Sequence, residues 1–289
     1  MQETLRKYAA DLRSSEELIE AHRQEMNSEQ DTREAIGILH SRGGWKEFEL
    51  GKQLTESGNP EDRIIGADIL SQLGLDKRSF HEESLAVLIN LLRDPDHQVI
   101  HYAAIGLGHR NDARAIPPLV ELAEHEDALV RFGVTFGLSC HDDEQAIAAL
   151  MQLCKDEDYD VRNWAMFDLA CQTDMDGPEI REALAAGLQD VEAEIRGEAL
   201  VGLARRKDAR AFPAIVKEWA AHDVSILSIE AAEELADPDL VPHLMNLQES
   251  LEFTEDDLYF QDRIEDALMA CEKNTEPVFN PGEDELEEE

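Results

Sequence analysis

The sequence predicts an all-α fold, a right-handed α-solenoid in which helical hairpins stack one after another along the chain. The main observation is a helix that recurs: Val161, Ala165 and Leu169 stand at i, i+4 and i+8, on one helical face. Looser copies of this helix end at intervals of 31 to 37 residues, on Leu70, Leu107, Leu138, Leu169, Leu203 and Leu235. Self-similarity at that period is typical of stacked repeats that bury their apolar faces on one another.

A second apolar run precedes each copy, so the repeating unit is a pair of helices, here called helix A and helix B. The A runs are Leu85–Leu92, Ile116–Ala123, Ala146–Cys154, Ile180–Leu188, Phe212–Trp219 and Leu240–Leu247. Turn-forming pairs punctuate the chain at Asn59-Pro60, Asp94-Pro95, Gly177-Pro178 and Asp237-Pro238. No stretch alternates apolar and polar residues for long enough to predict a sheet, and Asp158 is expected to cap its helix B.

The motif on helix B resembles that of the HEAT repeat. Asp160-Val161-Arg162, followed by Ala165 and Leu169, fits Asp-Val-Arg-x-x-Ala-x-x-x-Leu, and the short period is similar to the bacterial repeats of phycobilin lyases. A narrower resemblance, over roughly the C-terminal half, is to bacterial HEAT-repeat proteins encoded beside Rhs-type polymorphic toxins and regarded as immunity proteins. It is carried by Asp160–Ala165, Ile195–Ala199, Gly202–Asp208 and Glu230–Leu235. This resemblance implies binding of a cognate toxin domain.

The repeats are expected to fill residues 45–250, with different segments at both ends. Residues 1–44 carry only a weak apolar stripe and are predicted to form a helical N-terminal cap, with a partner-contacting arm as the alternative. Residues 251–274 are predicted to form a C-terminal capping helix. Residues 275–289 are mostly acidic and are predicted to be a disordered tail, which either aids solubility or steers a basic partner.

The formal net charge of −39 opposes binding to nucleic acid or to an anionic membrane, both of which need basic patches. It favours a basic partner, or serves solubility alone. No signal-peptide pattern or membrane-length apolar run is present, and the four cysteines form no Cys-x-x-Cys pair. We therefore expect a cytoplasmic protein with free, buried thiols, among which Cys140 and Cys171 occupy equivalent repeat positions, and a monomer when unbound.

No catalytic, metal-binding or cofactor-binding residues are predicted, so we expect no enzymatic activity. Deoxyhypusine hydroxylases resemble this fold and bind iron through His-Glu pairs after the Val-Arg of helix B. The corresponding pairs here are His101-Tyr102, Phe132-Gly133, Asn163-Trp164 and Gly197-Glu198. His97 and His101 share a helix face, but the sequence identifies no third ligand for a metal. Gly-rich phosphate loops and nucleophile elbows are absent as well.

Aromatic side chains recur in register on three consecutive B helices, away from the stripe that contains Val161. They and their neighbours are predicted to bind a partner: His101, Tyr102, Ile105, Phe132, Phe136, Asn163, Trp164 and Phe167. The alternative is that these rings pack between repeats, above all Trp164 and Phe167. Acidic residues are expected to surround the stripe: Asp158, Asp160, Glu198, Glu230, Glu233 and Glu234. We expect Arg131 and Arg162 to pair with Asp127 and Asp158.

The sequence thus favours a non-catalytic solenoid that binds a protein. Its most specific form is an immunity protein that neutralises a basic bacterial toxin, such as a nuclease, through an acidic, aromatic-lined concave face. That specificity comes from the resemblance, and the charge and the aromatic residues agree with it. A bilin lyase-like subunit and a general cytosolic scaffold are the alternatives.

The acidic tail is predicted to be dispensable for folding, because it has almost no apolar residues to bury. A chain truncated after Asn274 should melt within about 2 °C of the full-length protein in a thermal scan followed by circular dichroism. A large fall in the melting temperature would show that the tail docks on the repeats.

Overall fold

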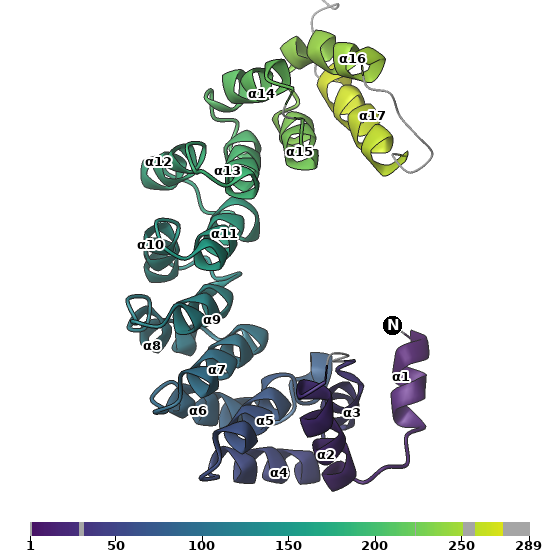
Figure 1. The fold of residues 1–289 in the computed structure, drawn as a ribbon, viewed down its shortest axis with the longest axis vertical. Helices are drawn as coiled ribbons and strands as arrows, with labels where there is room; N and C mark the ends of the chain where they lie inside the picture. Colours follow the sequence, from purple (N-terminus) through teal and green to yellow (C-terminus); the bar gives the residue numbers. More distant parts are fainter. Residues whose placement is uncertain (1, 29–31, 223, 251–257, 274–289) are drawn as a thin grey trace, which may run out of the picture. The chain divides into compact units, whose positions relative to one another are not determined.

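The computed structural model describes residues 2–28, 32–222, 224–250 and 258–273, and every regular element in these ranges is helical (Figure 1). The expected all-α solenoid fold is therefore confirmed. The chain forms two compact units, residues 1–168 and 169–289, which are described separately. The division falls within the span 45–250 that was predicted to hold the repeats. The predicted tail, 275–289, lies outside the described residues.

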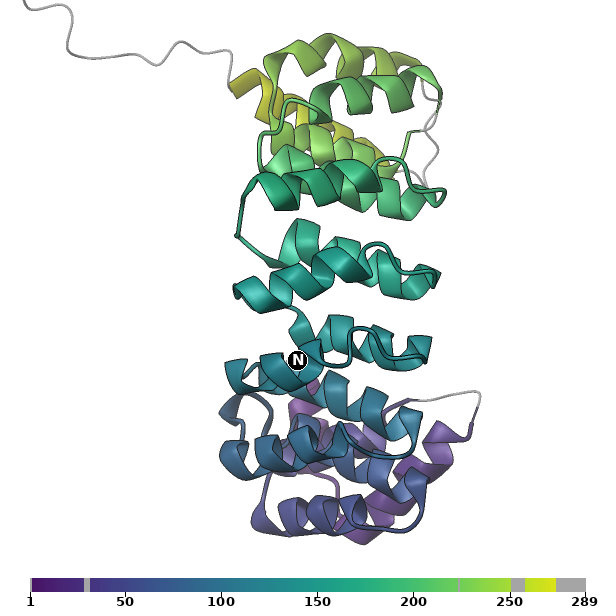
Figure 2. The same cartoon turned by 90° about the vertical axis from the view of Figure 1, so that its left-hand side faces the viewer.

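In the first unit, four helical hairpins follow three N-terminal helices. Helices A and B form two neighbouring rows, and consecutive hairpins stack as layers (Figures 1 and 2). The N-terminal helices are α1 (Gln2–Ala9), α2 (Ser15–Met26) and α3 (Glu34–Arg42). The A helices are α4 (Trp45–Thr55), α6 (His81–Leu91), α8 (Ile116–Val120) and α10 (Glu144–Leu153). The B helices are α5 (Pro60–Ser71), α7 (His97–Arg110), α9 (Ala128–Leu138) and α11 (Tyr159–Phe167).

The apolar stripe predicted for helix B is the core of the first unit. Val161 and Ala165 of α11 are fully buried, as are the equivalent Val130 and Val134 of α9. Removing such side chains from water is the main stabilising contribution to folding. The stripe therefore fixes which face of each B helix turns inward and leaves the opposite face for polar and aromatic side chains.

An aspartate caps each of three B helices, as was predicted for Asp158. The carboxylate of Asp158 accepts a hydrogen bond from the backbone N–H of Val161 at 3.2 Å. Asp127 caps α9 through the N–H of Leu129 at 2.9 Å, and Asp96 caps α7 in the same manner. These carboxylates satisfy N–H groups that the first helical turn leaves without an intrahelical partner.

The arginine of the repeat motif pairs with a different aspartate from the one we expected. Arg131 binds Asp156 with two hydrogen bonds of 2.6 and 2.8 Å, and Arg63 binds Asp94 with two of 2.7 Å. Asp156 precedes the cap residue of the next B helix by two positions, as Asp94 does. The prediction that Arg131 pairs with Asp127 was wrong, because Asp127 is occupied as a helix cap and as the partner of His97.

The intervening repeat lacks both members of this bridge. Ile100 of α7 stands where α9 has Arg131, and His125 stands where the next loop has Asp156. His125 still supplies an acceptor, because its Nδ1 receives the N–H of Asp127 at 3.1 Å. This repeat therefore lacks both the arginine and the aspartate of the bridge. Neither charge is left buried without its partner.

Close approach of α7 and α9 depends on glycine. A Cβ atom built on Gly108 would lie 2.5 Å from the carbonyl oxygen of Phe136. A Cβ on Gly133 would lie 3.0 Å from the carbonyl oxygen of His101. Without side chains at these two positions the helices pack backbone to backbone, and this brings the rings of His101 and Phe132 within contact distance.

The second unit continues the same pattern of hairpins. Its helices are α12 (Pro178–Gly187), α13 (Ala193–Arg205), α14 (Ala211–Ala220), α15 (Ile226–Leu235), α16 (Val241–Ser250) and α17 (Leu258–Lys273). The last of these lies within 251–274, the span that was predicted to hold a C-terminal capping helix; residues 251–257 and 274 are outside the described residues. Within this unit α13 packs on α15, and α15 packs on α17. The described residues therefore end on a helix that covers the last B helix.

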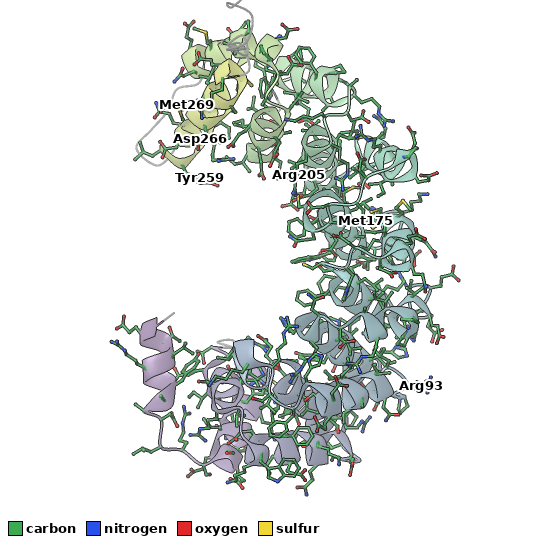
Figure 3. The ribbon with its side chains drawn as sticks, turned by 180° about the vertical axis from the view of Figure 1, so that it is seen from behind. Arg93, Met175, Arg205, Tyr259, Asp266 and Met269 are labelled. Carbon is green, nitrogen blue, oxygen red and sulfur yellow. The ribbon has the colours of Figure 1, made fainter. Side chains whose placement is uncertain are left out.

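A buried arginine near the end of helix B recurs in both units, three residues after the closing leucine. In the second unit Arg206 donates to the backbone carbonyls of Leu169, Ala170 and Met175, the last of which is labelled in Figure 3. In the first unit Arg110 donates to the carbonyls of Leu70 and Ser79. Each side chain satisfies carbonyl groups at a helix end or in a loop.

The burial of the four cysteines agrees only in part with the expectation from the sequence. The four cysteines are free thiols, as expected, but Cys140 is exposed and Cys171 half-buried, so only Cys154 and Cys271 are buried. Cys140 follows Ser139, the C-cap residue of α9, and has a left-handed backbone conformation with φ +60°. Within the described ranges, no helix has both the length and the apolar character that crossing a bilayer requires.

Replacing Arg131 with isoleucine should lower the free energy of unfolding of the first unit by about 3 kcal/mol. The nearly buried carboxylate of Asp156 would lose the cation that it binds, although its Oδ1 would still accept the N–H of Asp158. The double variant R131I/D156H copies the neighbouring Ile100–His125 pair and should recover at least half of that loss. Denaturant unfolding of both single variants and the double variant measures the coupling. Additive losses would contradict the bridge.

Asp168 should make the stability of the protein depend on pH. Burial raises the pKa of Asp168 to about 7 from 3.8, while Ser139 Oγ donates to its Oδ1 at 2.7 Å. Between these values the folded protein holds a proton that the unfolded chain has lost. The resulting stability is present in full below about pH 4 and is lost as the pH rises to about 7. Asp168→Asn cannot ionise, so its stability relative to wild type should rise by up to about 4 kcal/mol from pH 4 to pH 8.

The control for this experiment is Glu144→Gln, at an exposed position on α10. Melting temperatures of wild type and both variants between pH 4 and pH 8 test the assignment. A constant difference between wild type and Asp168→Asn across that range would show that Asp168 is ionised in the folded protein throughout.

Candidate functional site

Four rings from three consecutive B helices form a continuous chain of contacts in the first unit. The ring centroids of His101 and Phe132 are 5.7 Å apart, those of Phe132 and Trp164 are 6.1 Å apart, and those of Trp164 and Phe167 are 5.8 Å apart. Edge-to-face and offset contacts at these distances are favourable for aromatic pairs. We call His101, Phe132, Trp164 and Phe167 the ring chain.

The ring chain is partly open to solvent. Trp164 is 39% exposed, and the other three residues are half-buried. Trp164 was predicted to bind a partner, and it was also the first candidate, with Phe167, for the alternative of packing between repeats; it is the most exposed of the four. It stands one helical turn before Phe167, and it rests on Phe132 and Phe167 by contacts with their edges and faces. Each ring packs on a neighbouring repeat and also keeps exposed surface. The aromatic stripe is therefore neither fully exposed nor fully packed between repeats.

One hollow lies beside the middle of the ring chain. It has a volume of about 420 Å³ and is lined by His101, Ala128, Leu129, Phe132, Asp158, Asp160 and Trp164. We call it the acidic hollow, because two carboxylates and no lysine or arginine belong to its lining. Asp158 and Asp160 stand at the cap and in the first turn of α11, where the repeat stacking places them next to the loop before α9. The sequence-predicted residues Asp158 and Asp160 therefore do lie beside the aromatic stripe.

A second hollow lies on the other side of His101. It has a volume of about 320 Å³ and is lined by Arg33, Asp68, Ser71, Gln72, His101, Tyr102, Ile105, Gly106, His109 and Phe136. The predicted residues Tyr102, Ile105 and Phe136 are thus brought together here, and the rings of Phe136 and His109 are 5.0 Å apart. Burial lowers the pKa of both His101 and His109, so these rings are neutral near pH 7.

An ion pair between the exposed Arg33 and the buried Asp68 forms one wall of this second hollow. Arg33 donates to Asp68 at 2.8 Å, and Asp68 is 5% exposed. His22 Nε2 lies 3.4 Å from the same carboxylate, and His40 Nε2 donates to the backbone carbonyl of Asp68 at 2.7 Å. Burial opposes the charge of Asp68, but His22 and Arg33 hold its pKa below the usual value. Sequence analysis missed this cluster because its members come from three helices and a loop.

Asn163, the remaining predicted residue of α11, lines neither hollow. It is half-buried, and its Oδ1 accepts no hydrogen bond from the described part of the chain. Its position next to Trp164 in the sequence turns it toward a different side of the helix.

The predicted acids of the second unit have partners of their own. Glu233 pairs with Arg263 of α17, and the Cys171 thiol donates to Glu198 Oε2 at 3.8 Å. Burial, and then the nearby charge of Glu230, raise the pKa of Glu198 to about 7, so this residue is only partly ionised at neutral pH. Glu230 is half-buried and Glu234 is exposed. These residues belong to the second unit and are not assigned to the hollows of the first.

Cys171 is a poor nucleophile in this setting. Burial raises the pKa of its thiol to about 11, and the thiolate is the reactive form. Arg205, labelled in Figure 3, donates to the backbone carbonyl of Cys171 at 2.8 Å.

His97 and His101 do not form a metal site together. His97 Nδ1 lies 2.6 Å from Asp127 Oδ2, and His101 Nδ1 donates to the carbonyl of Leu129 at 2.9 Å. Both rings thus bind the next repeat. Among the residues that the structure describes, no group of three or more histidine, cysteine, aspartate or glutamate side chains is placed to hold a metal ion.

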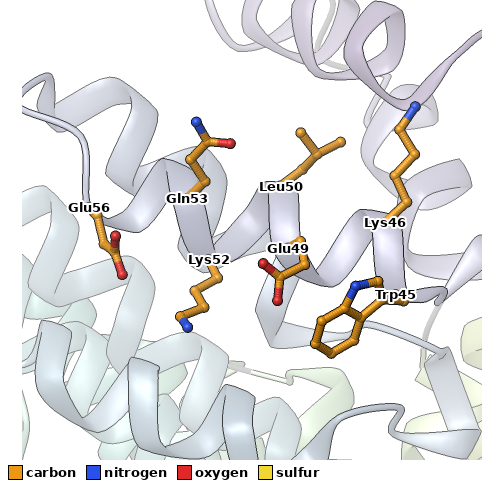
Figure 4. A pocket seen from close by; sticks show the side chains of 7 residues that line it. All are labelled: Trp45, Lys46, Glu49, Leu50, Lys52, Gln53 and Glu56. Carbon is orange, nitrogen blue, oxygen red and sulfur yellow. The ribbon is translucent and has the colours of Figure 1, made fainter.

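A third hollow, on α4, was not predicted from the sequence. Its lining residues all come from this one helix: Trp45, Lys46, Glu49, Leu50, Lys52, Gln53 and Glu56 (Figure 4). Trp45 is 62% exposed and packs against Phe48 and Phe80, with ring centroids 5.5 and 5.6 Å away. Lys46 is paired with Glu16 at 2.7 Å. Two lysines and two glutamates give this open face no net charge, so it lacks the electrostatic character of the acidic hollow.

Comparisons with known proteins agree with this architecture. Residues 85–170 match the family profile described as HEAT repeats. YibA, from two strains of Escherichia coli, is 41% identical over 69 residues, which is 24% of this chain, and the match spans only about a quarter of YibA, 25% of its length.

Solved structures extend the similarity to most of the chain. The crystal structure of E. coli YibA superposes with a TM-score of 0.69 and 27% identity, covering 90% of this chain and 93% of that one. An engineered protein superposes with a TM-score of 0.51 and 18% identity over 88% of this chain and 78% of its own, which shows the fold alone. Residues 85–170 thus match HEAT repeats, and the chain as a whole is similar in fold to YibA.

Proposed function

We propose that the chain is a non-catalytic solenoid that binds a protein partner through the ring chain of its first unit. The observation that carries the proposal is Trp164, which is 39% exposed and is held by Phe132 and Phe167. A ring that is already ordered by its neighbours loses little conformational freedom on binding. Partly exposed aromatic side chains of this kind are typical centres of protein interfaces.

The more specific proposal is that the partner is a toxin and that the chain is its immunity protein. It rests on the sequence resemblance to HEAT-repeat proteins encoded beside Rhs-type toxins. Two features are compatible with it: the net charge of −39 and the carboxylates beside the ring chain. A toxin that acts on nucleic acid has a basic surface, and an acidic protein could occupy that surface. In this proposal the protein acts in the cytoplasm, as a monomer until it binds.

Phe132→Ala and Trp164→Ala should each weaken partner binding by about 2 kcal/mol or more, a loss of about thirtyfold in affinity. Isothermal calorimetry with the toxin domain encoded beside the gene, together with a protection assay on co-expression, measures both consequences. Thermal denaturation should show a small effect for Trp164→Ala because the ring is exposed, and a larger one for the half-buried Phe132.

Trp45→Ala is the matched control, because Trp45 is an exposed tryptophan of the same unit on a different helix. It should leave both affinity and protection unchanged. Full protection by Trp164→Ala at unchanged stability would remove the ring chain from the binding site. Failure of the wild type to bind that toxin would leave a bilin lyase-like subunit or a general scaffold as the alternatives.

A further inference from the structure

We propose that the acidic hollow binds the side chain of an arginine that the partner presents. This inference rests on the proposed function and names the chemistry that the first unit recognises. The walls of the hollow are the rings of His101, Phe132 and Trp164, and its rim carries the carboxylates of Asp158 and Asp160. Aromatic faces next to carboxylates attract a cation by two independent routes, since the ring quadrupole and the negative charges act in the same direction.

No cation of the neighbouring repeats takes this place. Arg131, the motif arginine of α9, is 9% exposed and holds Asp156 with two hydrogen bonds. Arg162, the motif arginine of α11, donates to the backbone carbonyls of Asp156 and Glu157. Both guanidinium groups are thus engaged on the loop before α11, and neither belongs to the lining of the hollow. The motif arginines of α9 and α11 are therefore both held at the loop before α11. The carboxylates beside the rings have no arginine of these repeats against them in the hollow.

The lining favours arginine over lysine. A guanidinium is planar and weakly hydrated, so it can lie against a ring while its N–H groups reach a carboxylate. The ammonium of lysine is more strongly hydrated and keeps more of its water. Burial lowers the pKa of His101, which leaves a neutral ring in the wall and therefore no positive charge to repel a guanidinium. Leu129, which is 36% exposed, offers apolar surface for the methylene groups of the arginine stem.

The two carboxylates differ in what else they do. Asp158 Oδ1 caps α11 by accepting the N–H of Val161, so replacement of Asp158 would also disturb the helix. Asp160 is exposed, and the described structure assigns it no cap bond or ion pair. Asp160 is therefore the carboxylate whose removal tests recognition of the cation without a cost to the fold.

The test uses capped tripeptides Gly-Arg-Gly, Gly-Lys-Gly and Gly-citrulline-Gly as probes of the full-length protein labelled with 5-fluorotryptophan. The chain has three tryptophans, so three fluorine resonances report separately, and Trp164→Phe and Trp45→Phe assign two of them. The arginine peptide should shift the Trp164 resonance saturably in the millimolar range. The lysine peptide should bind at least about threefold more weakly. Citrulline, which has the shape of arginine without its charge, should cause no saturable shift.

Asp160→Asn should weaken binding of the arginine peptide at least about threefold, the scale expected for loss of one exposed charge pair. Glu157→Gln removes the same charge three residues earlier, in the loop before α11, but its side chain is 92% exposed and lies outside the hollow. It should change the affinity by less than about 1.5-fold.

Equal effects of Asp160→Asn and Glu157→Gln, or equal shifts at Trp45 and Trp164, would overturn the arginine site and show general attraction to an acidic protein. The peptide measurement is independent of the toxin-binding measurement. Loss of toxin binding in Trp164→Ala with no peptide response would keep the ring chain as an interface and reject the arginine. A specific peptide response without toxin binding would keep the arginine site and reject the proposed partner.

Discussion

Each hairpin of this protein buries its apolar face only on its neighbours, and the arrangement of all other side chains depends on that constraint. Val130 and Val134 of α9, and Val161 and Ala165 of α11, are fully buried at equivalent positions. Because a helix has one inward face, the stripe also decides which residues turn outward. The regular spacing of the stack then places equivalent outward residues of successive helices next to one another. A repeat that shifted in register would break the ring chain as well as the core.

The ring chain is a consequence of how closely the B helices can approach. Gly108 and Gly133 let the backbones of α7 and α9 meet, since a Cβ atom at either position would stand 3.0 Å or less from a carbonyl oxygen. With the helices at that separation, the rings of His101 and Phe132 stack, and Trp164 extends the row onto α11. A surface that could bind a partner is therefore built from the same contacts that hold the repeats together. This explains why its rings are partly buried and partly open.

The acidic residues of the chain have two kinds of role, which the net charge alone does not distinguish. Some aspartates are structural: Asp96 and Asp127 cap helices, and Asp94 and Asp156 hold the motif arginine of the preceding repeat. Others, such as Asp160 beside the ring chain, have no such role in the described structure and carry charge into solvent. Glu198 carries less than a full negative charge near pH 7, because its raised pKa leaves it partly protonated. The electrostatic field that a partner would meet is consequently weaker than the formal charge suggests.

Sequence alone determined the features that depend on local periodicity. The helical hairpins, the buried stripe through Val161, the cap at Asp158 and the final helix from Leu258 all follow from spacing within a few turns of one helix, which short-range sterics and hydrogen bonding decide. Tertiary structure decided the features that depend on contacts between repeats. The partner of Arg131 is Asp156 rather than Asp127, because the arginine reaches across the stack to the loop that precedes the next cap. The burial expected for Cys140 was wrong, and the sequence left open whether Trp164 is exposed or packed, since the packing of a side chain depends on the neighbouring helix and the local turn. The ion pair of Arg33 with the buried Asp68 had no signal in the sequence, because residues far apart in the chain meet there only once the helices are stacked.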